Sequence, residues 1–309
     1  MTRDELKKKK IAVLMGGRSC ERQISLLTGG AVLRALEGDG YHAVAIDPGQ
    51  DLAGRLIQEG IEVVFIALHG RFGEDGTVQG LLELLRIPYT GSGVLASSVA
   101  MDKEISKRLF VCHDIPTPDF LVLKRGEDGP VFQERLRAML PVVIKPVREG
   151  STFGVSIVTN EKGIGPGLTE AFRFDEKVLV EVFIAGEEIT VGVLDGVALP
   201  IIQVRPKSGF YDYAAKYTAG CTEYILPAPI DPKLYQRAQE LATEAYHALQ
   251  CQGAARVDFM IGAGRLYCLE VNTIPGLTET SLLPKAARHA GISFSELVQR
   301  MLEGASLKL

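Results

Sequence analysis

The sequence predicts a chain of mixed class, with a doubly wound parallel α/β sheet at the N-terminal end and α+β regions after it. Two patterns support this prediction. Through roughly the first ninety residues, short apolar runs alternate with helical patterns, which is typical of a parallel sheet with helices on both faces. Beyond Gly186 the chain is rich in strand patterns instead. The length of 309 residues is enough for two or three domains.

The N-terminal region is expected to hold strands and helices in strict alternation. The expected strands are residues 11–15, 44–46 and 63–67, and the expected helices are residues 24–36, 52–58 and 78–85. Helical spacing places four apolar residues near one face of the first helix: Ile24, Leu27, Ala31 and Ala35. Ligands of open parallel sheets bind beyond the carboxyl ends of the strands. The candidate binding loops are therefore residues 16–23 and 69–76.

A second region is expected to begin near Gly91-Ser92-Gly93. Its predicted elements are a helix at residues 97–112 and strands at residues 120–123, 142–145, 156–158 and 178–181. The strand-rich part after it is expected to contain a helix at residues 234–250, a hairpin that turns at Gly262-Ala263-Gly264, and a final helix at residues 294–303.

Composition excludes several classes of function. The net charge is −4 and the only basic cluster, residues 7–10, is interpreted as a solvated tail before the first strand, so nucleic-acid binding is not supported. The apolar run after it is too short for a signal peptide, and no run approaches the ~20 residues of a membrane span. The five cysteines form no C-x-x-C pair, which argues against a disulfide framework and structural zinc. A cytoplasmic protein is expected.

The chemistry is concentrated in the predicted hairpin. Alternation places five apolar residues on one face: Val257, Phe259, Ile261, Leu269 and Val271. The other face holds Arg256, Asp258, Glu270 and Asn272. Carboxylate and amide oxygens suit Mg²⁺ that also binds the phosphates of a nucleotide, and the arginine is placed to hold a carboxylate or a developing oxyanion. The alternative is a solvated strand face without a function.

Three other segments have features of ligand-binding loops. Residues 145–154 are rich in glycine and hydroxyl groups and can wrap backbone N–H groups around phosphate oxygens, with Lys145 adding a charge, or they form a mobile surface turn. Glu21 lies just before a predicted helix and either stabilises its N-terminus or binds an ammonium group. Residues 205–224 have the length of an active-site lid from which Lys216 reaches a phosphoryl group, or they form a disordered crossover.

Nine motifs, taken in order, resemble the D-alanine–D-alanine ligase family of the ATP-grasp superfamily. They are M-G-G-R-S-C-E-R, A-L-H-G-R-F-G-E-D-G, P-Y-T-G-S-G, M-D-K, I-K-P-V-R-E-G-S-T-F-G-V, Y-D-Y-A-A-K-Y, A-A-R-V-D-F-M, L-E-V-N-T-I-P-G-L-T and S-L-L-P. Each is weak alone, but together they span nearly the whole chain in the family's order. The resemblance implies a two-part ATP-grasp fold after the N-terminal domain, with domains at residues 1–96, 97–184 and 185–309.

The resemblance also implies an activity. ATP and two D-alanine molecules would give D-alanyl-D-alanine, ADP and phosphate for peptidoglycan synthesis, through a D-alanyl phosphate. The implied cofactors are ATP and two Mg²⁺ ions, for which Mn²⁺ can substitute. Neither nucleic acid nor a membrane is an implied partner, and the family favours a homodimer, although the sequence shows no interface.

Site residues follow from the resemblance by position. The residues implied to bind ATP are Lys103, Lys145, Ser151, Glu181, Glu188 and Lys216. The implied metal ligands are Asp258, Glu270 and Asn272. Those implied to bind the two amino acids are Glu21, His69, Arg256, Gly276, Ser281 and Leu282. The implied catalytic set is Glu21, Ser151, Tyr217, Arg256, Gly276 and Ser281.

Within this scheme several roles are more specific. Glu21 takes the ammonium of the first substrate, while Arg256 and the Gly276 backbone form the oxyanion site. Ser281 and Leu282 receive the carboxylate of the second substrate. In the family, a tyrosine at the place of Tyr217 accompanies D-alanine as second substrate, and a phenylalanine there accompanies D-lactate.

Two other functions remain open from the sequence. One is an ATP-grasp enzyme that joins a different amino acid or acid, because only the residues around the amino-acid site separate the two. The other is a nucleotide-binding regulator without turnover, although the intact set of polar residues on the hairpin speaks against it.

Overall fold

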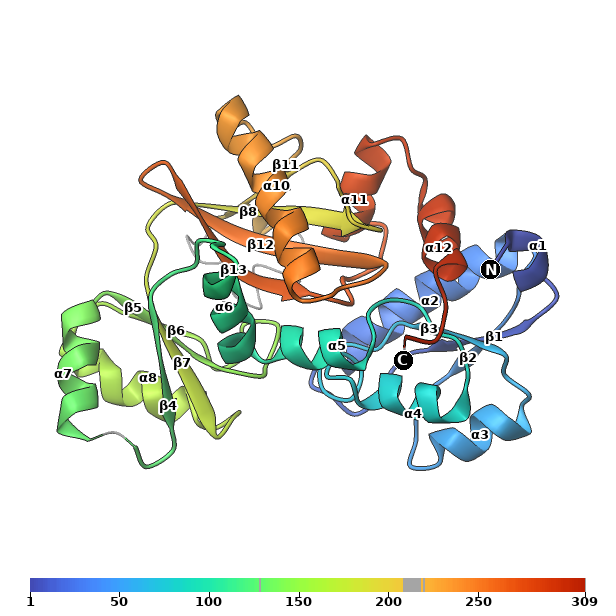
Figure 1. Cartoon of the computed structure of the whole chain (residues 1–309), viewed down its shortest axis with the longest axis horizontal. Helices are drawn as coiled ribbons and strands as arrows, with labels where there is room; N and C mark the ends of the chain where they lie inside the picture. Colours follow the sequence, from blue (N-terminus) through green and yellow to red (C-terminus); the bar gives the residue numbers. More distant parts are fainter. Residues whose placement is uncertain (128, 208–217, 219, 309) are drawn as a thin grey trace.

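The computed structural model describes residues 1–127, 129–207, 218 and 220–308, and its N-terminal part is the predicted parallel sheet (Figure 1). The strands are β1 (Lys10–Leu14), β2 (His42–Ile46) and β3 (Val63–Ile66), in the order β2-β1-β3. Alternate residues of β1 enter different cores: Ile11 and Val13 pack with one cluster, Ala12 and Leu14 with another. Both faces are therefore covered, which confirms the doubly wound prediction.

The helices of this region lie where the sequence predicts them, but the buried face of the first one differs. They are α2 (Arg22–Gly38), α3 (Leu52–Gln58) and α4 (Thr77–Leu85). In α2 the buried residues are Ser25, Thr28, Gly29, Val32 and Leu36, whereas the predicted Leu27 is 60% exposed. A Cβ on Gly29 would lie 2.3 Å from the Met15 side chain, so the small residues of α2 allow a close approach to the sheet. The predicted face of α2 was wrong.

Two further predictions of local structure were wrong. Residues 7–10 are not part of a free tail, because the helix α1 (Arg3–Leu6) precedes them and Lys10 begins β1. A capping box between Thr2 and Glu5 stabilises the start of α1. The helix expected at residues 97–112 is two helices, α5 (Val94–Met101) and α6 (Lys103–Cys112). Asp102 separates them because its backbone is extended and its side chain accepts a hydrogen bond from Ile105 N.

The central region is a four-stranded antiparallel sheet in the order β4-β7-β5-β6. Its elements are β4 (Phe120–Lys124), α7 (Pro130–Met139), β5 (Val142–Pro146), β6 (Ser156–Val158), η1 (Glu161–Gly163), α8 (Ile164–Ala171) and β7 (Lys177–Val182). One face packs on α7 and α8 through a hydrophobic cluster that includes Leu136, Ile144 and Leu168. The other face of this sheet is turned toward the C-terminal region, and Lys145 and Glu181 line the cavity between the two. The sequence did not predict α7 or α8.

The C-terminal region is a larger sheet in the order β11-β10-β8-β12-β13, with β9 paired to β8. Its elements are β8 (Glu187–Leu194), β9 (Val197–Ala198), β10 (Ile202–Pro206), β11 (Thr222–Ile225), α10 (Pro232–Ala248), β12 (Ala254–Gly262), β13 (Arg265–Asn272), α11 (Leu282–His289) and α12 (Phe294–Glu303). Side chains from α6 and α10 cover one face of this sheet. The opposite face, which carries Thr190 and Asp258, meets the central region.

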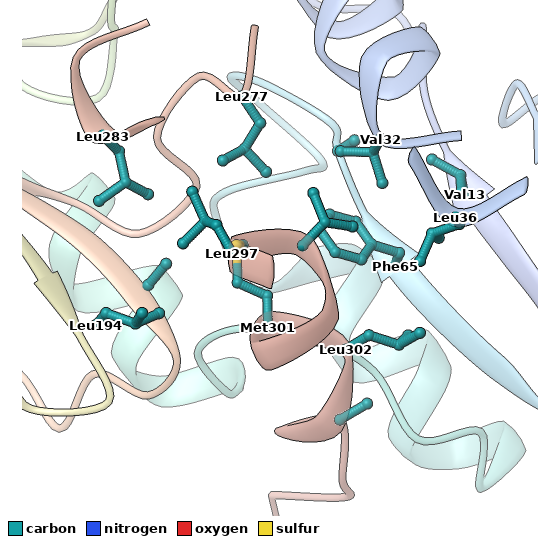
Figure 2. Close-up of a cluster of buried hydrophobic side chains, with 14 of the residues drawn as sticks. Val13, Val32, Leu36, Phe65, Leu194, Leu277, Leu283, Leu297, Met301 and Leu302 are labelled. Carbon is teal, nitrogen blue, oxygen red and sulfur yellow. The ribbon is translucent and has the colours of Figure 1, made fainter. Parts of the chain in front are cut away.

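The last helix joins the two ends of the chain (Figure 1). Leu297 and Met301 of α12 share one hydrophobic cluster with Val32 of α2, Phe65 of β3 and Leu194 of β8 (Figure 2). Burial of apolar surface in this cluster, at about 25 cal/mol per Å², holds the N-terminal sheet against the C-terminal one. The relative position of the two sheets is thus fixed by a common core.

Within the part of the chain that the structure describes, no helix is long and apolar enough to cross a membrane. All five cysteines are free thiols, as the absence of a C-x-x-C pair predicts.

Candidate active site

A cavity of about 440 Å³ lies between the central and C-terminal sheets. Its apolar wall includes Val143, Phe183, Ile184, Met260 and Leu269. The predicted residues that line it are Lys103, Lys145, Ser151, Glu181, Glu188, Asp258 and Glu270. An apolar slot that ends at two buried lysines suits an aromatic base with phosphates attached.

One carboxylate on the central sheet is shared by two lysines. Glu181 on β7 accepts a hydrogen bond from Lys145 on β5, and its other oxygen lies 2.9 Å from Nζ of Lys107 on α6. All three side chains are at most about a tenth exposed. Burial, the largest influence, raises the pKa of Glu181, but the two lysines outweigh it and the net shift of this pKa is downward. Glu181 is therefore ionised in the wall of the cavity.

The hairpin places its polar residues opposite each other. Asp258 pairs with Glu270 and Arg256 pairs with Asn272 across β12 and β13, as the alternation predicts. The turn consists of Ala263 and Gly264, both with positive φ, which is the two-residue hairpin turn that matches the twist of the strands.

The prediction that Leu269 lies on the apolar face was wrong. The register of the hairpin shifts after Asp258, so that Phe259 faces Cys268 and Leu269 is the extra residue of a β-bulge. Cys268 takes the place in the core, and Leu269 turns into the cavity.

Each acidic residue of the hairpin already has a cationic partner. Arg256 donates two hydrogen bonds of 2.9 Å to Asp258, and Thr190 on β8 donates a third of 2.6 Å. Glu270 lies 3.2 Å from Nζ of Lys103, which also donates to the carbonyl oxygen of Glu149. The side chains are thus held in fixed positions at the cavity wall.

The donor set fits a divalent cation bound together with phosphates. Like charges directly opposite in a sheet repel each other, so the Asp258 and Glu270 pair favours a cation between them. Among the residues described, no three His, Cys, Asp or Glu side chains cluster as a metal cage would require. Two carboxylates and the Asn272 amide are instead oxygen donors of the kind that Mg²⁺ uses together with substrate phosphates and water.

The glycine-rich loop between β5 and β6 connects this cavity with the N-terminal region. Ser151 and Thr152 have positive φ values of 49° and 64°, a conformation that costs non-glycine residues energy and is concentrated at functional sites. The Ser151 hydroxyl donates a hydrogen bond to Glu21 at the start of α2. The loop lies against another part of the chain and is not a free surface turn.

A second cavity of about 450 Å³ lies on the other side of this loop. The predicted residues that line it are Glu21, His69, Lys103, Ser151, Arg256, Glu270, Asn272, Gly276, Ser281 and Leu282. Leu27 also lines it, which explains why that side chain is not buried in the core. The wall that the two cavities share consists of Lys103, Glu149, Gly150, Ser151 and Glu270.

Two buried titratable groups face the second cavity. His69 is 6% exposed and its Nε2 lies 3.0 Å from the hydroxyl of Thr28. Burial, and then the charge of Arg256, lower the pKa of His69 to about 4, so the imidazole is neutral at pH 7. Glu74 accepts a hydrogen bond from Gly70 N, and burial followed by repulsion from Glu21 raises its pKa well above the usual value.

The turn that precedes α11 forms another wall of the second cavity. Ser281 is the N-cap residue of this helix, and its hydroxyl lies 2.8 Å from the Thr278 hydroxyl and accepts from Thr278 N. A Cβ on Gly276 would lie 3.0 Å from the Ser281 hydroxyl oxygen, so the backbone at Gly276 passes close to this group. The N-terminus of a helix favours a carboxylate ligand.

The predicted residues Lys216 and Tyr217 lie outside the described residues, as does most of the predicted lid. Three further polar residues of this region were not predicted from the sequence: Glu74, Glu149 and Lys107. Glu74 lies in the quoted motif A-L-H-G-R-F-G-E-D-G, and Lys107 follows Lys103 at the i, i+4 spacing that places both on one helix face. Both signals were available in the sequence.

The chain is similar along its whole length to known proteins. A family model described as the D-ala D-ala ligase C-terminus matches residues 109–303, and one described as the D-ala D-ala ligase N-terminus matches residues 47–92. The D-alanine–D-alanine ligase of Syntrophotalea carbinolica is 60% identical over 311 residues, with all of both chains covered. That of Citrifermentans bemidjiense is 53% identical, again with full coverage.

Solved structures agree with the sequence relatives. The D-alanine–D-alanine ligase of Bacillus anthracis in complex with ATP has a TM-score of 0.84 and 38% identity, covering 96% of this chain and 97% of that one. The VanG D-Ala:D-Ser ligase of Enterococcus faecalis has a TM-score of 0.82 and 31% identity, covering 96% and 98%. The chain belongs to the D-alanine–D-alanine ligase family and has the ATP-grasp fold of that family.

Proposed function

We propose that this chain joins two D-alanine molecules into D-alanyl-D-alanine, with ATP converted to ADP and phosphate. The observation that carries the proposal is the wall that the two cavities share. A nucleotide in the first cavity points its triphosphate at the same residues that an amino acid in the second cavity reaches with its carboxylate. Such an arrangement turns phosphoryl transfer between them into a reaction of positioned neighbours.

The first step forms a D-alanyl phosphate. Lys103 and Lys145 contact the phosphates, and backbone N–H groups of the glycine-rich loop surround them. Glu21, fixed by the Ser151 hydroxyl, holds the ammonium of the first D-alanine. The carboxylate of this first D-alanine then attacks the γ-phosphorus of ATP, and ADP leaves.

Asp258, Glu270 and Asn272 hold Mg²⁺ in this proposal. When bound, the ions neutralise charge on the transferring phosphoryl group. Mn²⁺ accepts the same oxygen ligands and can replace Mg²⁺.

The second step forms the peptide bond. Ser281 and Leu282, at the N-terminus of α11, hold the carboxylate of the second D-alanine, and its neutral amine attacks the acyl phosphate carbon. Arg256 and the Gly276 backbone stabilise the oxyanion that develops, and phosphate departs. Arg256 suits this role because Asp258 fixes its guanidinium while its side chain also lines the second cavity.

D-alanine is proposed as the second substrate. The two relatives with 60% and 53% identity carry the name D-alanine–D-alanine ligase, whereas the D-Ala:D-Ser ligase is 31% identical. Tyr217 supports the same choice by resemblance. We expect D-alanine to be used in preference to D-lactate at neutral pH, and a preference for D-lactate would contradict this assignment.

The direct test is incubation of the purified protein with MgATP and D-alanine as the only amino acid. ADP release and dipeptide, measured by a coupled assay and by mass spectrometry, should appear in a 1:1 ratio, as expected for one ATP per peptide bond. ATP binding without D-alanine-dependent ADP release would support the alternative of a nucleotide-binding regulator.

Compartment and assembly are further proposals. Free thiols and the use of ATP support a cytoplasmic location. The family resemblance supports a homodimer, which sedimentation of the purified protein would test.

A further inference from the structure

Arg71 bridges the N-terminal region and the central region. It lies on the loop between β3 and α4, and the proposed reaction does not use it. Its side chain lines a third cavity, of about 540 Å³. The Nη2 atom lies 2.9 Å from Oε1 of Glu149 and donates a hydrogen bond of 3.0 Å to the carbonyl oxygen of Phe174. One guanidinium therefore holds two separate loops of the central region.

Glu149, the ionic partner of Arg71, belongs to the wall that the first and second cavities share. Its side chain is 16% exposed, against 47% for Arg71. The carboxylate faces Arg71, while the carbonyl oxygen of the same residue accepts a hydrogen bond of 2.7 Å from Nζ of Lys103. That Nζ lies 3.2 Å from the Glu270 carboxylate. From the third cavity, Arg71 thus fixes the residue that holds a proposed phosphate-binding lysine.

The second contact of Arg71 braces the glycine-rich loop between β5 and β6. Phe174 belongs to the turn between α8 and β7, and its ring centroid lies 6.1 Å from that of Phe153 in the glycine-rich loop. A Cβ on Gly154 would lie 2.7 Å from the Phe174 ring, so the loop and the turn pack closely. The positive φ of Ser151 requires such support, because a strained backbone persists only where its surroundings fix it.

The loop that carries Arg71 also contributes to the amino-acid cavity. His69 and Glu74 come from this loop and line the second cavity, and a Cβ on Gly70 would lie 2.8 Å from Oε2 of Glu21. A D-alanine in this cavity therefore contacts the same loop from which Arg71 holds the glycine-rich loop. When one ligand fixes its own loop, Arg71 transmits that order to the loop that the other ligand needs.

We propose that Arg71 is a positioning residue that couples the binding of D-alanine to the binding of the nucleotide, by holding Glu149 and Phe174 against the loop at residues 69–76. This inference rests on the proposed use of ATP and D-alanine at the two cavities. We expect D-alanine to raise the affinity for the nucleotide by about fivefold or more, the lower end of common coupling between sites. Loss of Arg71 should leave the fold intact, because an ion pair with a half-exposed partner contributes little to the free energy of unfolding.

The test is the affinity for the β,γ-imido analogue of ATP, measured by calorimetry with Mg²⁺, in the absence and presence of saturating D-alanine. The analogue does not transfer its γ-phosphoryl group, so both ligands stay bound. Arg71→Met removes the charge and the donors and keeps most of the side-chain length. We expect the gain in affinity from D-alanine to fall from about fivefold or more to less than about twofold, while the affinity for the analogue alone changes less. An unchanged gain in Arg71→Met would overturn the proposal, as would a wild type without a gain.

Arg173→Met is the matched control. Arg173 lines the same third cavity, but its partner at 2.9 Å, Glu170, belongs to the central region as Arg173 does. This variant breaks no bridge between the regions and should keep the wild-type gain. A loss as large as that in Arg71→Met would show that the bridge is not the cause and would overturn the proposal.

A double-mutant cycle shows whether Arg71 acts through Glu149. Glu149→Gln breaks the same ion pair and should lower the gain by itself, and in that background Arg71→Met should lower it little further. Additive effects of the two substitutions would contradict an action through Glu149. If Arg71→Met does not fold, Glu149→Gln alone tests the proposal, and an unchanged gain there refutes it. Binding is measured without ligation, so a failure to make dipeptide would reject the proposed function and leave this measurement intact.

Discussion

Arg256 lines the second cavity, and its substitution tests the proposed oxyanion role directly. Its guanidinium is fixed by Asp258, which lies on the same strand, β12. Removal of one preorganised oxyanion donor typically lowers kcat by two to three orders of magnitude. We expect Arg256→Ala to lower kcat by at least ~100-fold in an ADP-release assay.

The control for this prediction is Arg237→Ala on α10, where the arginine is exposed and pairs with Glu240 and Glu244. It should keep wild-type turnover. Near-normal turnover of Arg256→Ala would refute the role of Arg256.

Substitution of Glu270 tests the proposed metal site. Glu270→Gln keeps the shape of the side chain and removes the negative charge opposite Asp258. We expect the Mg²⁺ concentration for half-maximal activity to rise at least ~10-fold, because Mg²⁺ binds through few protein carboxylates. Titration of activity with MgCl₂ at saturating ATP measures this. Glu244→Gln on α10 is the matched control, and an unchanged Mg²⁺ requirement in Glu270→Gln would remove Glu270 from the metal site.

His69 predicts a dependence of stability on pH. Its pKa falls from the usual 6.5 to about 4 in the folded protein. At pH values between 4 and 6.5 the unfolded chain binds a proton at His69 and the folded chain does not. The free energy of unfolding therefore falls as the pH drops from 6.5 toward 4, and above pH 6.5 His69 no longer changes it. The slope is about 1.4 kcal/mol for each pH unit.

Urea unfolding of wild type and His69→Gln at pH 7 and pH 5 tests this. The wild type should lose about 2 kcal/mol more than the variant over this interval. Glu74, with its raised pKa, acts in the opposite direction in both proteins and cancels in the comparison. His42→Gln, at an exposed position, should behave like the wild type. Equal losses in wild type and His69→Gln would show that His69 is not held neutral.

At the scale of elements, the β12–β13 hairpin, which holds the proposed metal ligands, agrees closely with the pattern in the sequence. Alternation predicts the face that holds Arg256, Asp258, Glu270 and Asn272, and the structure pairs these residues across the strands. It does not predict the bulge at Leu269, because an extra residue in one strand depends on tertiary packing, here the burial of Cys268.

The turn of this hairpin offers a test of the element independent of catalysis. Ala263 has a φ of 48°, which costs a residue with a Cβ, whereas asparagine tolerates this conformation. Ala263→Asn should raise the free energy of unfolding by about 1 kcal/mol. Gly264→Ala, where φ is 71° and the Cβ meets no atom within 4 Å, should lower it through the backbone alone. Chemical denaturation measures both, and a stabilising Gly264→Ala would contradict the turn assignment.

Elsewhere the errors have physical causes. The apolar residues of α2 predict one face for the core, but Leu27 lines the second cavity while small residues such as Gly29 pack on the sheet. The break at Asp102 needs a cap that helical periodicity does not show. Helix α8 contains Gly165, Pro166 and Gly167, so its propensity is low and packing must supply its stability.

At the scale of the whole molecule, the alternation of strands and helices predicts the N-terminal sheet, but local patterns do not predict how the regions meet. That depends on the hydrophobic cluster that brings Leu297 together with Val32 and Phe65 from the opposite end of the chain (Figure 2). The shared wall of the two cavities has the same origin, because Ser151 and Glu270 come from different sheets. The spacing of residues in the sequence does not predict that Ser151 and Glu270 lie close together, whereas the family resemblance does.

The transfer of an oxygen atom tests the proposed mechanism most directly. If the carboxylate of D-alanine attacks ATP across the shared wall, one of its oxygens bridges carbon and phosphorus and leaves with the phosphate. With D-alanine labelled by ¹⁸O in its carboxylate, the phosphate released during dipeptide synthesis should carry one labelled oxygen for each ADP formed. Unlabelled phosphate alongside dipeptide would show that no acyl phosphate forms and would contradict the account.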